Sequence, residues 1–136
     1  MKSEKTKLVA EIGCNHQGNL KTVFKMLNTL KNFCSIKYVK FQKRHSRELL
    51  TEEEYNSPHP NPVNSFGKTY GEHREKLEFD IATHKKIMKY CNKIGIIYCT
   101  SVWDITSAKE IVKTKCSNIK IPSACNNNLR MYISIS

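Results

Sequence analysis

Two lysines within apolar segments are the residues of this sequence best placed to do chemistry. Lys40 lies in the run Tyr38–Lys43, and Lys120 lies in the run Asn118–Ser123. An ammonium group in a buried strand needs a facing anion, because moving an unpaired charge out of water is costly. Two such lysines on neighbouring strands would form a pocket for a phosphate or carboxylate group. The alternative for either lysine alone is that its side chain reaches solvent at the strand end.

Hydroxyl and carboxylate groups accompany the two lysines. Thr100, Ser101 and Ser123 offer hydroxyl donors suited to phosphate oxygens, although each could equally cap the end of a strand. For Glu11, the simplest role is a salt bridge to Lys40, and the alternative is to position a substrate hydroxyl. Together these groups favour a site for an anionic small molecule.

One loop histidine, His16 in the segment NHQG, raises the question of a metal site. It has no partners at the spacing of metal ligands, so a structural role in the loop is favoured. The motifs GxGxxG, GxxxxGK[ST] and GxSxG are absent from the sequence. Dinucleotide-binding, nucleotide-binding and serine-hydrolase functions therefore lack support.

Four short apolar runs alternate with amphipathic stretches, and this order predicts a parallel α/β sheet. The expected strands are Leu8–Gly13, Tyr38–Lys43, Ile96–Ser101 and Asn118–Ser123. Three helices are expected. The first begins after the N-cap Asn19, the second runs from about Thr83 to a stop at Gly95, and the third begins after the N-cap Asp104. The long connection 44–82 between two of these units is predicted to be a functional loop or lid.

Alternation along the second strand sorts its side chains onto two faces. Val39 and Phe41 share one face, whereas Lys40 and Gln42 share the other. An apolar face covered by helices, opposed to a polar inner face, favours a closed barrel. An open doubly wound sheet is disfavoured because its strands are hydrophobic on both faces. We assign Tyr98 of the third strand to the inner face as well.

Composition and charge limit the classes of protein. The chain has 136 residues, of which 39% are hydrophobic and 26% charged, as in an ordinary globular domain. A formal net charge of +11 favours anionic partners. The lysines nevertheless have the spacing of solvated helix faces, and the aromatic residues are not interleaved with them. A basic nucleic-acid-binding module, the alternative from a different class, is therefore disfavoured, and no nucleic-acid partner is expected.

Six cysteines occur without a CxxC pair or the spacing of a zinc site. The amino terminus, MKSEKTKLVAEIG, is too polar for a signal peptide, and no apolar run approaches membrane-spanning length. We therefore expect free thiols in a cytoplasmic protein without a membrane partner.

Several segments in order carry a family resemblance. The segments AEIGCNHQGN, VKFQK, FGKTYGEHR, LEF, CTSVWD and KIPSACNNN resemble the N-acetylneuraminate (sialic acid) synthase family, and the match runs from about Leu8 to Asn128. The resemblance implies a homodimeric enzyme that condenses phosphoenolpyruvate with N-acetylmannosamine or a related N-acyl sugar and releases phosphate. It also implies a TIM (β/α)8 barrel followed by an antifreeze-like domain, and a divalent metal, Mn or Mg.

The resemblance also implies roles for particular residues. The residues expected to bind phosphoenolpyruvate are Lys40, Thr100, Lys120 and Ser123, Glu11 matches the family's active-site glutamate, and Gln42 matches a sugar-contacting glutamine. The metal ligands belong to later strands of the barrel, so no metal ligand is expected in this chain. The alternative enzyme is a condensing barrel of the 3-deoxy-octulosonate phosphate synthase kind, which FGKTYGEHR and KIPSA disfavour.

The match to the family predicts the N-terminal half of the barrel. Residues 1–128 are expected to form about four βα units of a truncated (β/α)8 barrel, with the antifreeze-like domain absent. Residues 129–136, LRMYISIS, do not have the pattern of the amphipathic helix that the family would place there. With both edges of the sheet open, we expect the chain to be inactive alone and prone to self-association.

Overall fold

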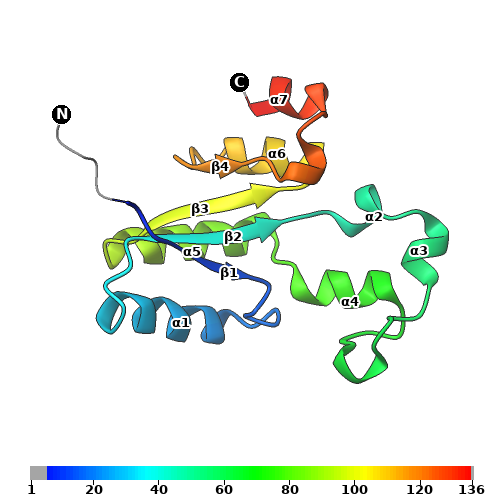
Figure 1. The fold of residues 1–136 in the computed structure, drawn as a ribbon, viewed down its shortest axis with the longest axis horizontal. Helices are drawn as coiled ribbons and strands as arrows, with labels where there is room; N and C mark the ends of the chain where they lie inside the picture. The colour runs from blue at the N-terminus through cyan, green and yellow to red at the C-terminus, as the bar shows by residue number, and fades with distance from the viewer. Residues whose placement is uncertain (1–5, 136) are drawn as a thin grey trace.

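The four predicted strands form one parallel sheet in the computed structural model, which describes residues 6–135. The strands are β1 (Val9–Gly13), β2 (Tyr38–Lys43), β3 (Ile97–Val102) and β4 (Ile119–Lys120), and they lie side by side in chain order (Figure 1). Each prediction of a strand is confirmed; β2 has the predicted bounds, and the boundaries of the other strands shift by at most three residues. The parallel order requires a crossover between each pair of strands, and helical segments make all three.

Three amphipathic helices follow the strands as predicted. They are α1 (Leu20–Asn32), α5 (Ile81–Lys93) and α6 (Ile105–Val112). The side chain of Asn19 caps α1 by accepting hydrogen bonds from two backbone N–H groups, and Asp104 caps α6 in the same way. Helix α5 begins slightly before the expected Thr83, because the carboxylate of Asp80 accepts a hydrogen bond from the Thr83 N–H.

The connection 44–82, predicted as a loop, contains helical turns instead. These are α2 (Ser46–Leu49), α3 (Glu52–Asn56), the 3₁₀ turn η1 (Pro62–Asn64) and α4 (Tyr70–Leu77). A capping box starts α3, in which Thr51 and Glu54 satisfy each other's backbone N–H groups. Figure 1 shows these helices in a lobe beyond the carboxyl ends of β1 and β2.

The prediction that LRMYISIS would not be helical is wrong. After the 3₁₀ turn η2 (Ser123–Cys125), residues Leu129–Ile135 form helix α7. Met131 is fully buried in a small apolar cluster with residues of β3 and α6, and Ile135 packs against the same cluster. The four-residue spacing of these two side chains gives the helix its buried stripe.

The main core lies between one face of the sheet and the helices α1 and α5. It contains the strand residues Val39, Phe41 and Tyr98, all at most 4% exposed, together with Leu27 and Ile87 from the two helices. The assignment of Tyr98 to the polar inner face is therefore wrong. The opposite face of the sheet carries Lys40 and Gln42, as the alternation along β2 predicted.

Candidate functional site

The register of the strands brings the predicted polar residues onto one face. Glu11 pairs with Lys40 across β1 and β2, Gln42 pairs with Ser101 across β2 and β3, and Ser101 pairs with Lys120 across β3 and β4. Directly paired residues in a parallel sheet project from the same face. The face opposite the core therefore carries a row of groups that can bind an anion, and we call it the inner face.

Thr100 does not belong to this row, which corrects the sequence prediction. It pairs with Phe41, a core residue, and its side chain is completely buried on the side covered by the helices. The neighbouring residue Ser101 occupies the inner face instead. Its hydroxyl accepts a hydrogen bond from the Lys40 ammonium group at 3.3 Å. The hydroxyl group of β3 that can serve an anion site is thus that of Ser101.

Lys40 lies between two partners on adjacent strands. Its ammonium group forms an ion pair with the Glu11 carboxylate and also donates to Ser101. The Lys40 side chain is 16% exposed, whereas that of Glu11 is 48% exposed. The salt bridge expected for Glu11 is confirmed. Because the carboxylate is half exposed, an incoming anion can replace it as the lysine's partner without crossing the core.

Lys40 and Lys120 both lie on the inner face, although they are not on neighbouring strands as the sequence predicted. They lie on β2 and β4, and β3 runs between them with Cys99 and Ser101 on the same face. Burial raises the pKa of the Cys99 thiol, Glu11 adds to this, and the two lysines oppose it. Both ammonium groups therefore contribute positive potential at the centre of the inner face.

Two further predicted residues lie at the carboxyl ends of the strands. Gln42 approaches the β1 end closely, since a Cβ atom on Gly13 would lie 3.3 Å from its side-chain nitrogen and 3.4 Å from a Glu11 oxygen. Gly13 has φ +54°, a conformation that suits glycine. Ser123 begins η2 just beyond β4 and is exposed. Within residues 6–135 its side chain forms no hydrogen bond with the row, in which Lys40 contacts Ser101 and Glu11.

An ion pair links the beginning of the connection 44–82 to a residue near its end. Arg44 and Glu78 form this pair with both side chains 10% exposed, and Arg44 also donates to the Cys14 sulfur at 2.8 Å. Burial raises the pKa of the Glu78 carboxyl, and Arg44 opposes the shift. This pair holds the C-cap of α4 beside the residue that follows β2, and the contact with Cys14 joins both to the end of β1.

Sequence reasoning missed a buried lysine. Lys43 is 2% exposed on the core side, where its ammonium group lies 3.2 Å from a Glu110 oxygen and 3.1 Å from His45 Nε2. The alternation that separates Val39 and Phe41 from Lys40 also places Lys43 with the core residues, so the signal was present. Lys43 binds the end of β2 to α6 and is not part of the inner face.

The structural role predicted for His16 is confirmed. Its ring is buried and stacks on Phe79 at a centroid distance of 4.3 Å, and its Nδ1 accepts a hydrogen bond from the Gly18 N–H at 3.1 Å. Burial lowers its pKa to about 4, so it is neutral at physiological pH. A second buried histidine, His84, lies 2.6 Å from the Tyr98 hydroxyl in the core.

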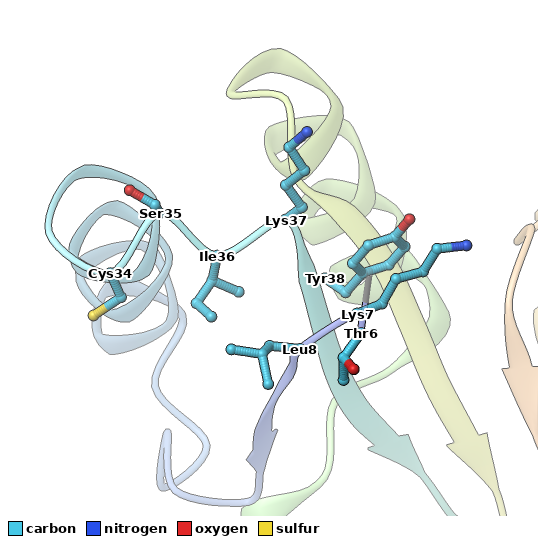
Figure 2. Close-up of a pocket in the computed structure, with 8 residues that line it drawn as sticks. All are labelled: Thr6, Lys7, Leu8, Cys34, Ser35, Ile36, Lys37 and Tyr38. Carbon is cyan, nitrogen blue, oxygen red and sulfur yellow. The ribbon is translucent and has the colours of Figure 1, made fainter. Parts of the chain in front are cut away.

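A hollow of about 510 Å³ lies at the opposite end of the strands from the polar row. Figure 2 shows Leu8 and Ile36 pointing toward each other there, between β1 and the end of α1. Active sites of α/β barrels occur at the carboxyl ends of the strands. This hollow is at the amino ends, so we do not assign the chemistry to it.

Within residues 6–135, no three His, Cys, Asp or Glu side chains are grouped so that they could hold a metal ion. The inner-face carboxylate, Glu11, is engaged with Lys40. The described residues thus do not themselves fit the divalent-metal site that the family resemblance implies. All six cysteines are free thiols in the structure, as predicted. No helix in the same range is long and apolar enough to cross a membrane.

Comparison with known proteins identifies the family. The model of the NeuB family matches residues 26–135, which is most of the chain. The chain belongs to the NeuB family. A mouse N-acetylneuraminate-9-phosphate synthase is 35% identical over 126 residues, which cover 89% of this chain and 33% of that protein. The N,N'-diacetyllegionaminic acid synthase of Campylobacter jejuni is 25% identical, over 93% of this chain and 37% of its own length.

The fold agrees with the family. A sialic acid synthetase structure from Leptospira borgpetersenii superposes with a TM-score of 0.75 at 18% identity, covering 96% of this chain and 41% of that one. The prediction of four βα units of a TIM-barrel-type fold is confirmed. The NeuB-family chain described here spans about a third of the length of the curated relatives that it matches.

Proposed function

We propose that this chain provides the first four βα units of a nonulosonate synthase. The enzyme joins phosphoenolpyruvate to N-acetylmannosamine or a related N-acyl sugar and releases phosphate. The single observation that carries the proposal is the inner-face row, in which Glu11, Lys40, Ser101 and Lys120 follow one another across four strands of a NeuB-family fold. A phosphate and a carboxylate on one small substrate require this combination of cations and a hydroxyl.

Phosphoenolpyruvate binding is proposed to exchange the partner of Lys40. In the free chain this ammonium group is neutralised by Glu11. A substrate phosphate or carboxylate, held also by Lys120 and Ser101, would take over that interaction. Glu11 would then be released beside the bound substrate, with its carboxylate unpaired. It could accept a proton from the water molecule whose oxygen replaces the departing phosphate.

The sugar is proposed to lie above the phosphoenolpyruvate, toward the carboxyl ends of the strands. Gln42 is one pleat beyond Lys40 on the same face, and its amide can both donate to and accept from sugar hydroxyls. The new carbon–carbon bond joins C3 of phosphoenolpyruvate to the sugar aldehyde carbon. A product phosphorylated at C9, as the mouse relative's name states, therefore requires a sugar phosphorylated at C6.

Three features of the complete enzyme stay predictions from the family. They are a divalent metal, Mn or Mg, a homodimer and a cytoplasmic location, and none is assigned to a residue of this chain. Ser123 stays a predicted phosphoenolpyruvate ligand, and it lies in η2, three residues after the Lys120 end of β4. For Thr100, the completely buried position argues against a direct contact with substrate.

The proposal is tested by restoring the remainder of the barrel. This chain is fused to the part of the mouse relative that follows the matched region. Phosphate release is then measured with phosphoenolpyruvate and either N-acetylmannosamine, its 6-phosphate or arabinose 5-phosphate. We expect turnover with at least one N-acyl sugar, and turnover with arabinose 5-phosphate alone would refute the proposed substrate class.

Lys120→Met in the same fusion tests the anion pocket. We expect the Michaelis constant for phosphoenolpyruvate to rise at least about tenfold, because a charge-assisted contact of roughly 1.5–3 kcal/mol is lost. Lys25→Met is the matched control, since it removes the same charge from the exposed surface of α1, outside the inner face. Equal constants for the two variants would show that Lys120 does not bind the substrate.

A further inference from the structure

A groove on the outer surface of the fold is lined by four lysines. Lys85 and Lys89 come from α5, and Lys113 and Lys115 come from the turn that follows α6. The hollow between them has a volume of about 380 Å³, and the partly buried Met88 contributes to its wall. Helices α5 and α6 pack against the core side of β3, so this groove is on the opposite side of the sheet from Lys40.

The four ammonium groups have no anionic partner in the described structure. All four lysines are exposed, and no ion pair or side-chain hydrogen bond involves them within residues 6–135. The sequence contains no Asp or Glu in the stretches 81–103 and 111–136. The carboxylates of the flanking residues are engaged elsewhere: Asp80 caps α5 and Glu110 binds Lys43. Four positive charges therefore surround one hollow without a compensating carboxylate.

The turn that presents two of the lysines is held by its own hydrogen bonds. The Thr114 hydroxyl donates to the Ile111 carbonyl at 2.6 Å, and the Lys115 N–H donates to the Val112 carbonyl at 2.9 Å. Lys115 has φ 58°, a left-handed conformation that closes the turn. Because the backbone is fixed, only side-chain rotation is needed to direct Lys113 and Lys115 at a ligand. Preorganisation of this kind lowers the entropic cost of binding.

We propose that this groove binds a small molecule that carries a diphosphate or triphosphate group. Four ammonium groups from two elements can contact several phosphates at once, and a single phosphate would leave part of this charge unpaired. The volume lies within the range of small-ligand pockets. A single-stranded nucleic acid is a poorer fit, because no aromatic side chain lines the groove to stack against a base. The site is independent of the function proposed for the inner face.

Binding is tested with inorganic tripolyphosphate and the 136-residue chain by isothermal titration calorimetry at constant ionic strength. We expect one molecule bound per chain. The double variant Lys89→Ala/Lys113→Ala should weaken binding at least about tenfold, because each substitution removes a charge-assisted contact. The matched control is Lys21→Ala/Lys25→Ala, an exposed pair on α1 that lowers the net charge by the same amount. Circular dichroism of both variants verifies that they fold.

Four outcomes would overturn the proposal. They are the absence of binding, an equal loss of affinity in both double variants, competition by phosphoenolpyruvate, and a single-stranded oligonucleotide that binds more tightly than tripolyphosphate at the same groove. The second outcome would show a response to net charge alone. The third would relocate the ligand to the inner face, where Lys120→Met should then abolish binding and the groove variant should not. The fourth would identify the groove as a nucleic-acid surface.

Discussion

Two adjacent hydroxyl residues of β3, Thr100 and Ser101, allow single substitutions to distinguish an effect on anion binding at the inner face from an effect on the stability of the core. Ser101→Ala removes the oxygen that accepts a hydrogen bond from Lys40 at 3.3 Å. Thr100→Val removes an oxygen on the core side and keeps the shape of the side chain almost unchanged. The two substitutions delete the same functional group one residue apart, so each serves as the control for the other.

The two substitutions are expected to change different quantities, namely the free energy of unfolding for Thr100→Val and the affinity for an anion for Ser101→Ala. Thr100 is completely buried, and its hydroxyl donates a hydrogen bond to the Ser101 carbonyl at 3.5 Å. Thr100→Val should therefore lower the free energy of unfolding by about 1 kcal/mol, the net value of one buried hydrogen bond. Ser101→Ala leaves Lys40 paired with Glu11 and should change stability by less than that. Its effect falls on anion binding, because the substitution removes a hydroxyl that contacts Lys40 and can donate to the anion. The affinity for phosphoenolpyruvate should weaken by about three- to tenfold.

Urea unfolding measures the first effect, and titration of the 136-residue chain with phosphoenolpyruvate, followed by NMR, measures the second. We expect Thr100→Val to shift the unfolding midpoint with unchanged affinity, and Ser101→Ala to do the reverse. The assignment of faces would be refuted if Thr100→Val weakened phosphoenolpyruvate binding as much as Ser101→Ala does. Such a result would mean that β3 is displaced by one residue in solution.

Two further predictions concern stability. Gly18→Ala should lower the free energy of unfolding by at least about 2 kcal/mol in urea, because φ is +68° and a Cβ would overlap the backbone oxygen of Lys76. Gly95→Ala, at φ +71° but with only the flexible Lys31 side chain near the added Cβ, is the control and should cost only about 1 kcal/mol. Burial lowers the pKa of His16 to about 4 and that of His84 to about 3, so the unfolded chain binds more protons below about pH 6.5. Stability should fall as the pH drops from about 6.5 toward 4, and a urea midpoint unchanged between pH 7.5 and 5 would contradict this.

The secondary structure could be predicted wherever the pattern of side chains was unambiguous. From Val39 to Gln42 in β2, apolar and polar residues alternate, and both the strand and the faces of Lys40 and Gln42 were predicted correctly. Helices α1 and α6 were located by their caps, Asn19 and Asp104, because an Asn or Asp before an apolar stripe marks a helix start.

The face of Thr100 could not be assigned because β3 has no such alternation. Its sequence IYCTSV places Cys99, Thr100 and Ser101 in a row, and these three side chains are similar in size and polarity. A shift of one residue exchanges the two faces of a strand. Only the pairing of Lys40 with Cys99 and of Phe41 with Thr100 fixes the register, and this pairing is a property of the folded sheet.

Other errors came from signals that were present but not used. The capping box of Thr51 and Glu54 indicated a helix inside the connection 44–82. The spacing of Met131 and Ile135 indicated the buried stripe of α7. In both cases a short helix of five to seven residues has too few turns to show a convincing period. Packing against a neighbouring element, which the sequence does not reveal, stabilises these helices.

The lysine groove shows where reading one helix at a time fails. Taken alone, Lys85 and Lys89 are four residues apart on an exposed helix face, and such a pair is typical of a solvated surface. Lys113 and Lys115 look like the basic end of another helix, where cations are favourable. The fold places both pairs around one hollow, and none of the described residues that line it carries a carboxylate to compensate their charges. Scattered charge in a sequence therefore does not exclude a concentrated charge on the surface.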